Sequence, residues 1–184
     1  LAELSMELEL PKLLLAILER AISLLKVTGG DLGLYQEDTH EILIVVSLNL
    51  DKDYTGVRLK AGEGGMGYAA EIGEAVIIRD YSTWPNRSAQ YSEGPWHAAM
   101  AAPLTIGGRP VGTLSIVDSD EQREFTASDL RVLTLFAYQA AVAIQNARLF
   151  ESERHRGDDL ENLLRTSRAI SSSIEPEEVM KEIT

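Results

Sequence analysis

Two apolar runs joined by a Gly-Gly turn, between His97 and Asp118, constrain the fold of this 184-residue chain more than any other feature. The runs Ala98 to Ile106 and Val111 to Val117 are rich in small and β-branched residues. Gly107-Gly108 can adopt the positive φ angles that a two-residue hairpin turn requires. The segment therefore predicts a long β-hairpin.

The second arm of this hairpin is not divided into a polar and an apolar face. Side chains alternate along a strand, so one face carries Val111, Thr113, Ser115 and Val117, and the other carries Gly112, Leu114 and Ile116. Because neither face is uniformly polar, we expect the hairpin to lie in the middle of a sheet that is covered on both sides.

The overall composition limits the classes of protein to consider. With 45% hydrophobic residues, the chain can form one full core, and one domain plus an extension is expected. Its net charge of -12 disfavours binding to nucleic acid or to an anionic membrane. No long apolar span or secretory signal is present, which predicts a cytoplasmic protein. The absence of cysteine excludes thiol nucleophiles, thiolate metal sites and disulfides.

The part of the chain before the hairpin predicts a mixture of helices and strands. Leucine and isoleucine recur at helical spacing from Leu10 to Lys26, and Thr28-Gly29-Gly30 is expected to end this helix. The expected elements that follow are strands at Asp31 to Gln36, Glu41 to Leu48, Val57 to Lys60 and Ala75 to Ile78, and a short helix at Met66 to Glu71.

A long helix is expected after the hairpin. Thr126 can cap its start, with Asp129 three residues later, and the helix should continue through Arg154. Its apolar residues recur by threes and fours at Leu130, Leu133, Ala137, Ala140, Ile144 and Ala147. This row is typical of a coiled-coil seam, but packing on the sheet would give the same spacing. Both kinds of contact can coexist on different faces of the helix.

The end of the chain repeats its beginning at an offset of 166 residues: Leu4-Ser5 matches Ile170-Ser171, Leu8-Glu9 matches Ile174-Glu175, Leu13-Leu14 matches Val179-Met180, and Ile17 matches Ile183. Similarity between two amphipathic segments is the alternative explanation. The repeat predicts a first domain over residues 1–156, followed over 157–184 by a connecting helix and the start of a second copy.

Three segments together resemble a GAF domain, the sensory module of many bacterial signalling proteins. They are LKAGEGGMGYAAEIGEAVIIRD, AAPLTIGGRPVGTLSIVD and FTASDLRVLTLFAYQAAVAIQNARLF. The resemblance implies an α+β fold with an antiparallel sheet of five to six strands. It implies terminal helices on one face and a small-molecule pocket on the other, and dimerisation through the terminal helices. Such a resemblance predicts the fold of the chain more reliably than it predicts the ligand.

The chain departs from several branches of this family. Cyclic-nucleotide-binding members carry an Asn-Lys pair, a Phe and an Asp-Glu pair, where this chain has Asp118-Ser119, Phe125 and Asp129-Leu130. Phytochrome-type relatives usually tether a bilin through cysteine, and the methionine-sulfoxide reductases of this fold also need cysteine. The departures argue against all three activities, and the cofactor stays unknown.

The segment from Arg79 to His97 is the expected wall of a ligand pocket, because it combines aromatic rings with polar groups. Its candidate ligand-binding residues are Arg79, Asp80, Tyr81, Trp84, Arg87, Tyr91, Trp96 and His97. Arg87 could pair with an anionic ligand, or remain a solvated loop residue. The alternative for the whole segment is a surface loop whose aromatic side chains fill the core and leave no room for a ligand.

Other motifs offer little chemistry. The segment Gly62 to Gly67 fits the GxGxxG pattern, but Gly73 should stop the following helix too early for a dinucleotide site. No histidine pair has metal-ligand spacing, and His97 fits a structural role better than that of a haem ligand. No hydrolase constellation is present.

The sequence therefore predicts a non-enzymatic sensory module that binds a small molecule and signals through its terminal helices to an output domain of the parent chain. A homodimer formed through these helices is expected. The alternatives are a ligand-free structural dimerisation module in a tandem GAF array and, third, an enzyme.

Overall fold

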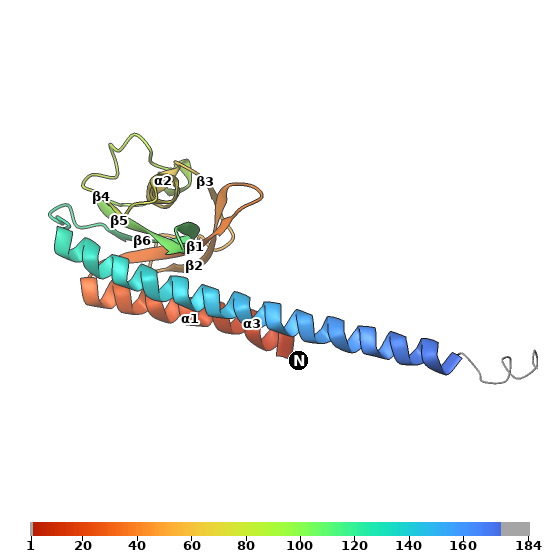
Figure 1. The fold of residues 1–184 in the computed structure, drawn as a ribbon. Coiled ribbons are helices and arrows are strands. Elements are labelled where there is room, and N and C mark those ends of the chain that lie inside the picture. The colour runs from red at the N-terminus through yellow and green to blue at the C-terminus, as the bar shows by residue number, and fades with distance from the viewer. Residues whose placement is uncertain (1, 174–184) are drawn as a thin grey trace, which may run out of the picture. The chain divides into compact units, whose positions relative to one another are not determined.

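The computed structural model describes residues 2–173, and it divides into two compact units, Leu1–Gln145 and Asn146–Thr184. The first unit contains a six-stranded sheet (Figure 1). Every neighbouring pair of strands is antiparallel, and the order is β3-β2-β1-β6-β5-β4. The strands are β1 Gly29–Gln36, β2 Glu41–Leu48, β3 Arg58–Lys60, β4 Val76–Ile78, β5 Ala98–Ile106 and β6 Arg109–Asp118.

The predicted central hairpin is confirmed as β5 and β6. Gly107 and Gly108 form its turn with φ angles of 57° and 79°. The register shifts between Leu104 and Thr105, because Leu104 pairs with Gly112 whereas Thr105 pairs with Pro110. Val111 is therefore an extra residue in the ladder, and it packs with the core cluster that contains Leu114. The prediction that Val111 shares a face with Thr113 was wrong, since a bulge breaks the alternation of side chains.

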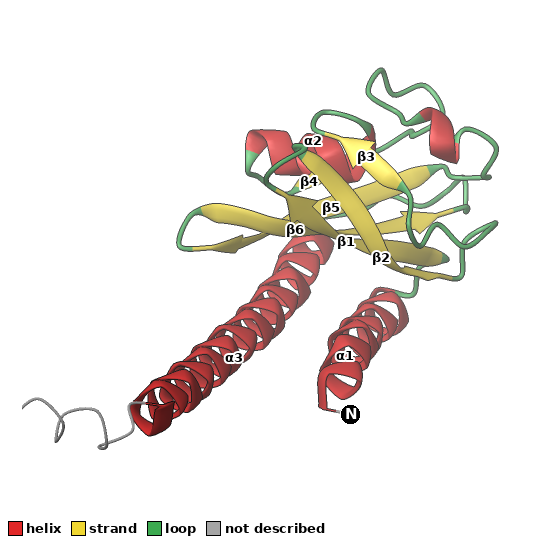
Figure 2. Cartoon of the chain, turned by 90° about the vertical axis from the view of Figure 1, so that its right-hand side faces the viewer, coloured by secondary structure: helices red, strands yellow, loops and turns green. Residues whose placement is uncertain are grey.

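Two helices cover one face of the sheet (Figure 2). They are α1 Ala2–Leu25 and the first part of α3, which as a whole spans Ala127–Ser173. Between helices and sheet lies the larger apolar core, formed by buried residues such as Leu14, Leu18, Leu32, Met100, Leu114, Ile116 and Leu133. The predicted α+β architecture, with terminal helices on one face, is confirmed.

The bounds of α1 differ from those predicted. The helix begins eight residues before Leu10 and contains Pro11. It ends at Leu25, and Lys26 adopts a left-handed conformation with φ of 52°. Gly29 and Gly30 belong to β1 instead of a turn. A Cβ atom at either glycine would overlap backbone oxygens of neighbouring segments, so these glycines permit close strand packing.

The opposite face carries α2 Gly64–Ile72 and the segment 79–97, which we call the flap. A second apolar cluster lies there, and it joins Tyr81, Tyr91 and Trp96 of the flap to Ile42, Ile44 and Val117 of the sheet. The flap contains one short 3-10 helix, Ala89–Tyr91. The rings of the flap thus fill much of the space above the sheet.

The start of α3 is stabilised as predicted. The backbone N–H and the hydroxyl of Thr126 both lie 2.8 Å from Asp129 Oδ2, and Asp129 N–H donates to Thr126 Oγ1 at 3.2 Å. This reciprocal pair is a capping box. The helix extends to Ser173, well beyond Arg154.

The predicted seam of α3 packs inside its own domain. Leu133, Ala137, Ala140 and Ile144 are buried in the larger core cluster. Of the two interpretations, packing on the sheet is therefore the one that holds for these residues. A different row stays exposed: Leu135, Val142 and Leu149, at seven-residue intervals, expose 64%, 36% and 56% of their surface.

Among the residues that the structure describes, one helix segment, Ala127–Arg154, is long and apolar enough by composition to cross a membrane. Its residues Leu133, Ala137 and Ile144 belong to the core of the first unit. Packing within the domain therefore explains part of the apolar character of this segment, of which 28% is buried.

The second unit contains the remainder of α3 up to Ser173. Leu149, Phe150, Leu163 and Leu164 are exposed there. Most of the predicted second repeat lies outside the described residues, which end at Ser173.

Candidate functional site

A small cavity lies between the sheet and the flap. Its volume is about 20 Å³, enough for roughly one water molecule. The strands, α2 and the flap all contribute to its lining, which consists of Asp31, Leu59, Gly64, Gly65, Met66, Tyr81, Tyr91, Trp96, Ala99, Ser115 and Val117. Most of these groups are apolar, so the few polar ones define its chemistry.

Asp31 is the charged residue of this cavity. It lies in β1, between Ser47 of β2 and Ser115 of β6, and only 3% of its surface is exposed. Its Oδ2 accepts a hydrogen bond of 2.6 Å from the Tyr91 hydroxyl. Its Oδ1 is buried and has no hydrogen-bond partner within 3.5 Å among the described residues. A buried carboxylate oxygen of this kind is costly, which marks the position as one that needs a further partner.

Burial raises the pKa of Asp31 to about 6. The Tyr91 hydrogen bond and the nearby Ser47 hydroxyl oppose this rise, and the charges of Asp53 and Asp51 add to it. The pKa of Tyr91 is raised as well, first by burial and then by the negative charge of Asp31. Asp31 therefore changes its charge closer to neutral pH than an ordinary aspartate does.

Tyr91, whose hydroxyl bonds Asp31, also stacks its ring on Tyr54 in the loop between β2 and β3. The rings of Tyr91 and Tyr54 are stacked with centroids 4.1 Å apart. Tyr54 donates a hydrogen bond of 2.8 Å to Asp51 Oδ1, and burial is the main cause that raises the pKa of Tyr54. The flap is thus held to the sheet by a buried hydrogen bond and a ring stack at the same residue.

The N-terminus of α2 meets the cavity beside Asp31. The Gly64 N–H donates to the Asn86 carbonyl at 2.7 Å, and the Gly67 N–H donates to the Glu63 carbonyl at 3.1 Å. The N–H groups of Gly65 and Met66, which lie between them, have no acceptor among the described residues. Free N–H groups at the start of a helix favour negative charge.

Close packing holds α2 in this position. The Thr113 hydroxyl donates to the Met66 carbonyl at 3.3 Å, which joins α2 to β6. A Cβ atom on Gly65 would lie 3.2 Å from Ile78 Cδ1 and 3.6 Å from Ala101 Cβ. The glycine therefore allows the helix to approach the sheet closely enough to bring its first turn to the cavity.

Three of the eight predicted ligand-binding residues line this cavity: Tyr81, Tyr91 and Trp96. Tyr81 accepts a hydrogen bond of 3.2 Å from the Ser88 N–H, and burial is the main cause that raises its pKa. Trp96 is buried, and its Nε1 has no hydrogen-bond partner among residues 2–173. Trp84 lies outside the lining and meets Tyr68 edge to face with centroids 5.3 Å apart.

Asp80 and Arg87 act within the flap itself. The Asp80 carboxylate accepts hydrogen bonds from the hydroxyls of Ser82 and Thr83 at 2.6 and 2.9 Å, and these bonds lower its pKa. Arg87 donates to the Ser82 carbonyl at 2.7 Å. Both residues stabilise a local turn, and neither reaches the cavity.

Arg79 and His97 line a separate hollow of about 160 Å³. Its other lining residues are Glu121, Gln122, Arg123, Glu124 and Phe125, which belong to the connection between β6 and α3. Five of the eight predicted residues therefore lie in these two places, and Asp80, Trp84 and Arg87 line neither.

The prediction missed Asp31, Gly65, Met66 and Ser115 as cavity residues. One signal for Asp31 is present in the sequence, because it is the acidic residue inside the strand GGDLGLYQ. A carboxylate in a central strand must be buried, paired or functional. The glycines of α2 carry no comparable signal, since turn geometry explains them equally well.

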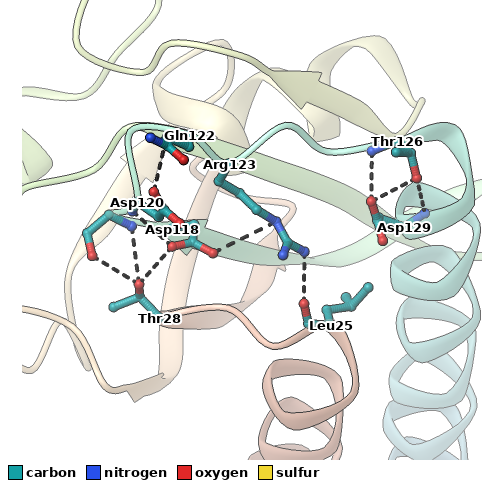
Figure 3. A network of polar contacts seen from close by, with 9 residues as sticks. Leu25, Thr28, Asp118, Asp120, Gln122, Arg123, Thr126 and Asp129 are labelled. Carbon is teal, nitrogen blue, oxygen red and sulfur yellow. Dashed lines mark hydrogen bonds and ion pairs between the residues drawn. The ribbon is translucent and has the colours of Figure 1, made fainter.

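A polar network joins the end of α1 to the connection between β6 and α3 (Figure 3). Arg123 donates to the Leu25 carbonyl at 2.8 Å, its Nε lies 3.9 Å from Asp118 Oδ2, and its guanidinium stands 4.8 Å from the centre of the Phe125 ring. Thr28 donates to Asp118 Oδ1 at 3.1 Å. Asp118 stands where the cyclic-nucleotide pattern has Asn, and Asp129 matches the Asp of that pattern; both have structural partners here, Thr28 and Thr126.

The described residues contain no group of three or more His, Cys, Asp or Glu side chains that could hold a metal ion. The GxGxxG segment leads into the nine-residue helix α2, and the sheet is antiparallel throughout. Gly73 ends this helix in a left-handed conformation. The segment therefore lies outside the βαβ unit that a dinucleotide site requires.

Comparisons with known proteins agree with this architecture. The chain is 27% identical over 128 residues to the nitrogen fixation protein VnfA of Azotobacter vinelandii, an alignment that covers 66% of this chain and 24% of that protein. The chain thus spans about a quarter of the length of this relative.

Solved structures show the same fold. A GAF domain from a phosphoenolpyruvate-protein phosphotransferase of Coxiella burnetii matches with a TM-score of 0.70 and 22% identity, over 78% of this chain and 86% of that one. The GAF-B domain of DevS from Mycobacterium smegmatis matches with a TM-score of 0.61 and 22% identity, over 79% and 98%. A GAF-domain family model matches residues 7–145, and the chain therefore belongs to the GAF family.

Proposed function

We propose that this chain is a non-enzymatic GAF sensory module of a multidomain cytoplasmic signal transduction protein. It binds a small molecule between the sheet and the flap and signals through its terminal helices. In this proposal residues 1–156 form the sensory domain, and residues 157–184 form a connecting helix and the start of a second repeat.

One observation carries the ligand-binding part of the proposal. Asp31 is almost fully buried and lines the cavity, and its Oδ1 has no hydrogen-bond partner within 3.5 Å among the described residues, although the nearby Ser47 hydroxyl stabilises the charged form. A residue kept only for stability would be expected to have both oxygens satisfied or to be apolar. The buried, half-satisfied carboxylate instead fits a site whose second partner is a ligand.

Signal transmission is supported by the network around Arg123. Asp118 ends β6, the strand that also carries the cavity residues Ser115 and Val117. Arg123 connects Asp118 to the last turn of α1, and it stacks on Phe125 just before α3 begins. A shift of β6 on ligand binding would therefore reach both terminal helices, provided that the ligand binds the two arrangements with different affinity.

The homodimer is supported by the exposed apolar side chains of both helices in the first unit. These are Leu13 and Leu24 of α1, and Leu135, Tyr138 and Val142 of α3. A hollow of about 610 Å³ lies between α1 and α3, lined by Leu24 and Phe136 among others. Large exposed apolar rows on monomers are typical of interaction surfaces.

The dimer can be tested with charge substitutions on this row. We expect L135E and V142E to shift the protein from dimer to monomer in sizing chromatography with light scattering. T105E is the control, because Thr105 is exposed on β5, outside both terminal helices, and the substitution adds the same charge. A wild-type monomer at high concentration would contradict this part of the proposal.

The ligand-binding part is tested by thermal shift against a metabolite panel that includes nucleotides, amino acids and haem. A true ligand raises the melting temperature by mass action. A panel without any hit would contradict ligand binding.

A ligand-free structural dimerisation module in a tandem array is the second candidate. Its support is the small size of the cavity, about 20 Å³, which the flap rings nearly fill. A dimer that responds to no ligand would favour this function over sensing.

A further inference from the structure

The cavity beneath the flap is lined by a hydrogen-bond acceptor and by hydrogen-bond donors that have no partners among the described residues. Asp31 Oδ1, from the sheet, is a buried acceptor without a donor. The amides of Gly65 and Met66, at the start of α2, are donors without an acceptor. All three residues line the same small space.

These two sets of groups prefer different charges. A buried carboxylate oxygen forms its strongest hydrogen bonds with a cationic donor such as an ammonium group. Free N–H groups in the first turn of a helix prefer an anion, and the partial positive charge of the helix end adds to this preference. A ligand that satisfies both must carry a positive and a negative group close together.

We propose that the cavity binds a free α-amino acid or a closely similar small zwitterion, with the ammonium group on Asp31 and the carboxylate on the amides of Gly65 and Met66. This inference rests on the proposed ligand-binding function and specifies the ligand class for it. Ser115, which lies opposite Asp31 on β6, supplies a neutral hydroxyl in the same space.

Binding requires the flap to move. A space of about 20 Å³ holds roughly one water molecule, whereas an amino acid is several times larger. Tyr91 is the group that must yield, since its hydroxyl occupies Asp31 Oδ2 and its ring stacks on Tyr54. With three N–H donors, the ammonium group of the ligand can bond Oδ1 and also replace the Tyr91 hydroxyl on Oδ2. The exchange would release the short helix Ala89–Tyr91 from the sheet and so couple occupancy to the position of the flap.

The first experiment uses the whole chain and the free proteinogenic L-amino acids as probes. Thermal shift identifies the strongest binder, and titration calorimetry measures its Kd. We then compare this amino acid with its N-acetyl derivative and its carboxamide, each of which lacks one of the two charges. We expect at least a tenfold weaker affinity for both derivatives, because each loses one charged hydrogen-bonding group.

A second arm uses protein variants. We expect D31N to weaken binding of the same amino acid at least tenfold, whereas D38N, which makes the same change at an exposed carboxylate in the turn between β1 and β2, should leave the Kd unchanged. Circular dichroism checks that both variants are folded. If D31N fails to fold, the comparison of ligand derivatives in the wild-type protein still decides the question.

The outcomes separate this inference from the proposed function. If nucleotides or haem bind and no amino acid does, the zwitterion is wrong and the sensory function stands. If the N-acetyl derivative or D31N binds as tightly as the reference, the assigned contacts are wrong. If nothing in either panel binds, the ligand-binding function itself fails.

Discussion

Tyr91 of the flap donates a hydrogen bond of 2.6 Å to Oδ2 of Asp31 in the central strand β1, across sixty residues of sequence. Both residues are buried, and the contact joins the irregular segment 79–97 to the sheet. Other flap residues bond the start of α2 and the residue before it, as the Asn86 carbonyl accepts from the Gly64 N–H at 2.7 Å and the Ser88 hydroxyl donates to Glu63 Oε1 at 2.6 Å. The Tyr91–Asp31 contact adds a buried side-chain hydrogen bond between the flap and the sheet itself.

Removal of the Tyr91 hydroxyl should destabilise the protein. Y91F leaves Asp31 Oδ2 without its donor, and an unsatisfied buried charged group costs about 1–3 kcal/mol or more. Urea denaturation should show this loss in the free energy of unfolding. Y35F is the control, because Tyr35 bonds His40 in an exposed contact, and its effect should stay within about 0.5 kcal/mol. Equal effects of the two substitutions would contradict the role of Tyr91.

The ionisation of Asp31 should make stability depend on pH. The folded pKa is about 6 and the ordinary value is 3.8, so the folded protein binds this proton more tightly than the unfolded chain. The contribution of Asp31 is therefore fully present below about pH 4 and is lost as pH rises past about 6, a change of about 3 kcal/mol. The groups that act on Asp31 are Tyr91, Ser47, Asp53 and Asp51.

The variant D31N isolates this dependence. The free energy of unfolding of D31N minus that of the wild type should increase by about 2.4 kcal/mol between about pH 4 and pH 7.5. D80N is the control, since hydrogen bonds from Ser82 and Thr83 lower the pKa of Asp80, and its stabilising effect is lost as pH falls. A difference for D31N that stays flat with pH would show that Asp31 titrates normally.

Gly112 should not tolerate a side chain. A Cβ atom there would overlap the Gly33 carbonyl oxygen of the neighbouring strand, and this backbone cannot move without disturbing the β1–β6 pairing. We expect G112V to lose more than about 3 kcal/mol of stability or to fail to fold. T105V, at an exposed position of β5, should change stability by less than about 0.5 kcal/mol. Unchanged stability of G112V would argue against its central position.

Arg123 should connect the helices to the sheet in a measurable way. R123M retains much of the aliphatic length but removes the hydrogen bond to the Leu25 carbonyl and the ion pair with Asp118. We expect a loss of about 1.5–3 kcal/mol in unfolding free energy, the usual range for a hydrogen bond to a charged group. Hydrogen exchange should also show faster opening at the last turn of α1. R109M, at an exposed turn residue, should leave both measurements unchanged.

Sequence patterns correctly predicted those structural elements that are determined by residues close together in the sequence. The Gly107-Gly108 turn, the reciprocal Thr126–Asp129 cap and the apolar strand at 41–48 follow from backbone angles, side-chain hydrogen bonding and hydrophobic alternation. The fold class followed from these elements in their order. Predictions were weaker where a residue is required by packing against a segment distant in sequence. Gly29 and Gly30, which belong to β1, are examples, because neighbouring backbone leaves no room for a Cβ atom there.

The candidate site was predicted only in part for the same reason. Tyr81, Tyr91 and Trp96 stand out in a polar segment, so composition located them. Asp31 acquires its raised pKa and its half-satisfied carboxylate only because β2, β6 and the flap enclose it. Arg79 and His97, adjacent in the same segment, turn instead toward the β6–α3 connection.

The amino-acid sequence alone determined the family, the strands and the capped helix of this protein, because these depend on neighbours a few residues apart. Tertiary structure decided which face of α3 is buried and which carboxylate lies under the flap. Burial and electrostatic environment are set by groups brought together from distant parts of the chain, and only the folded arrangement specifies them.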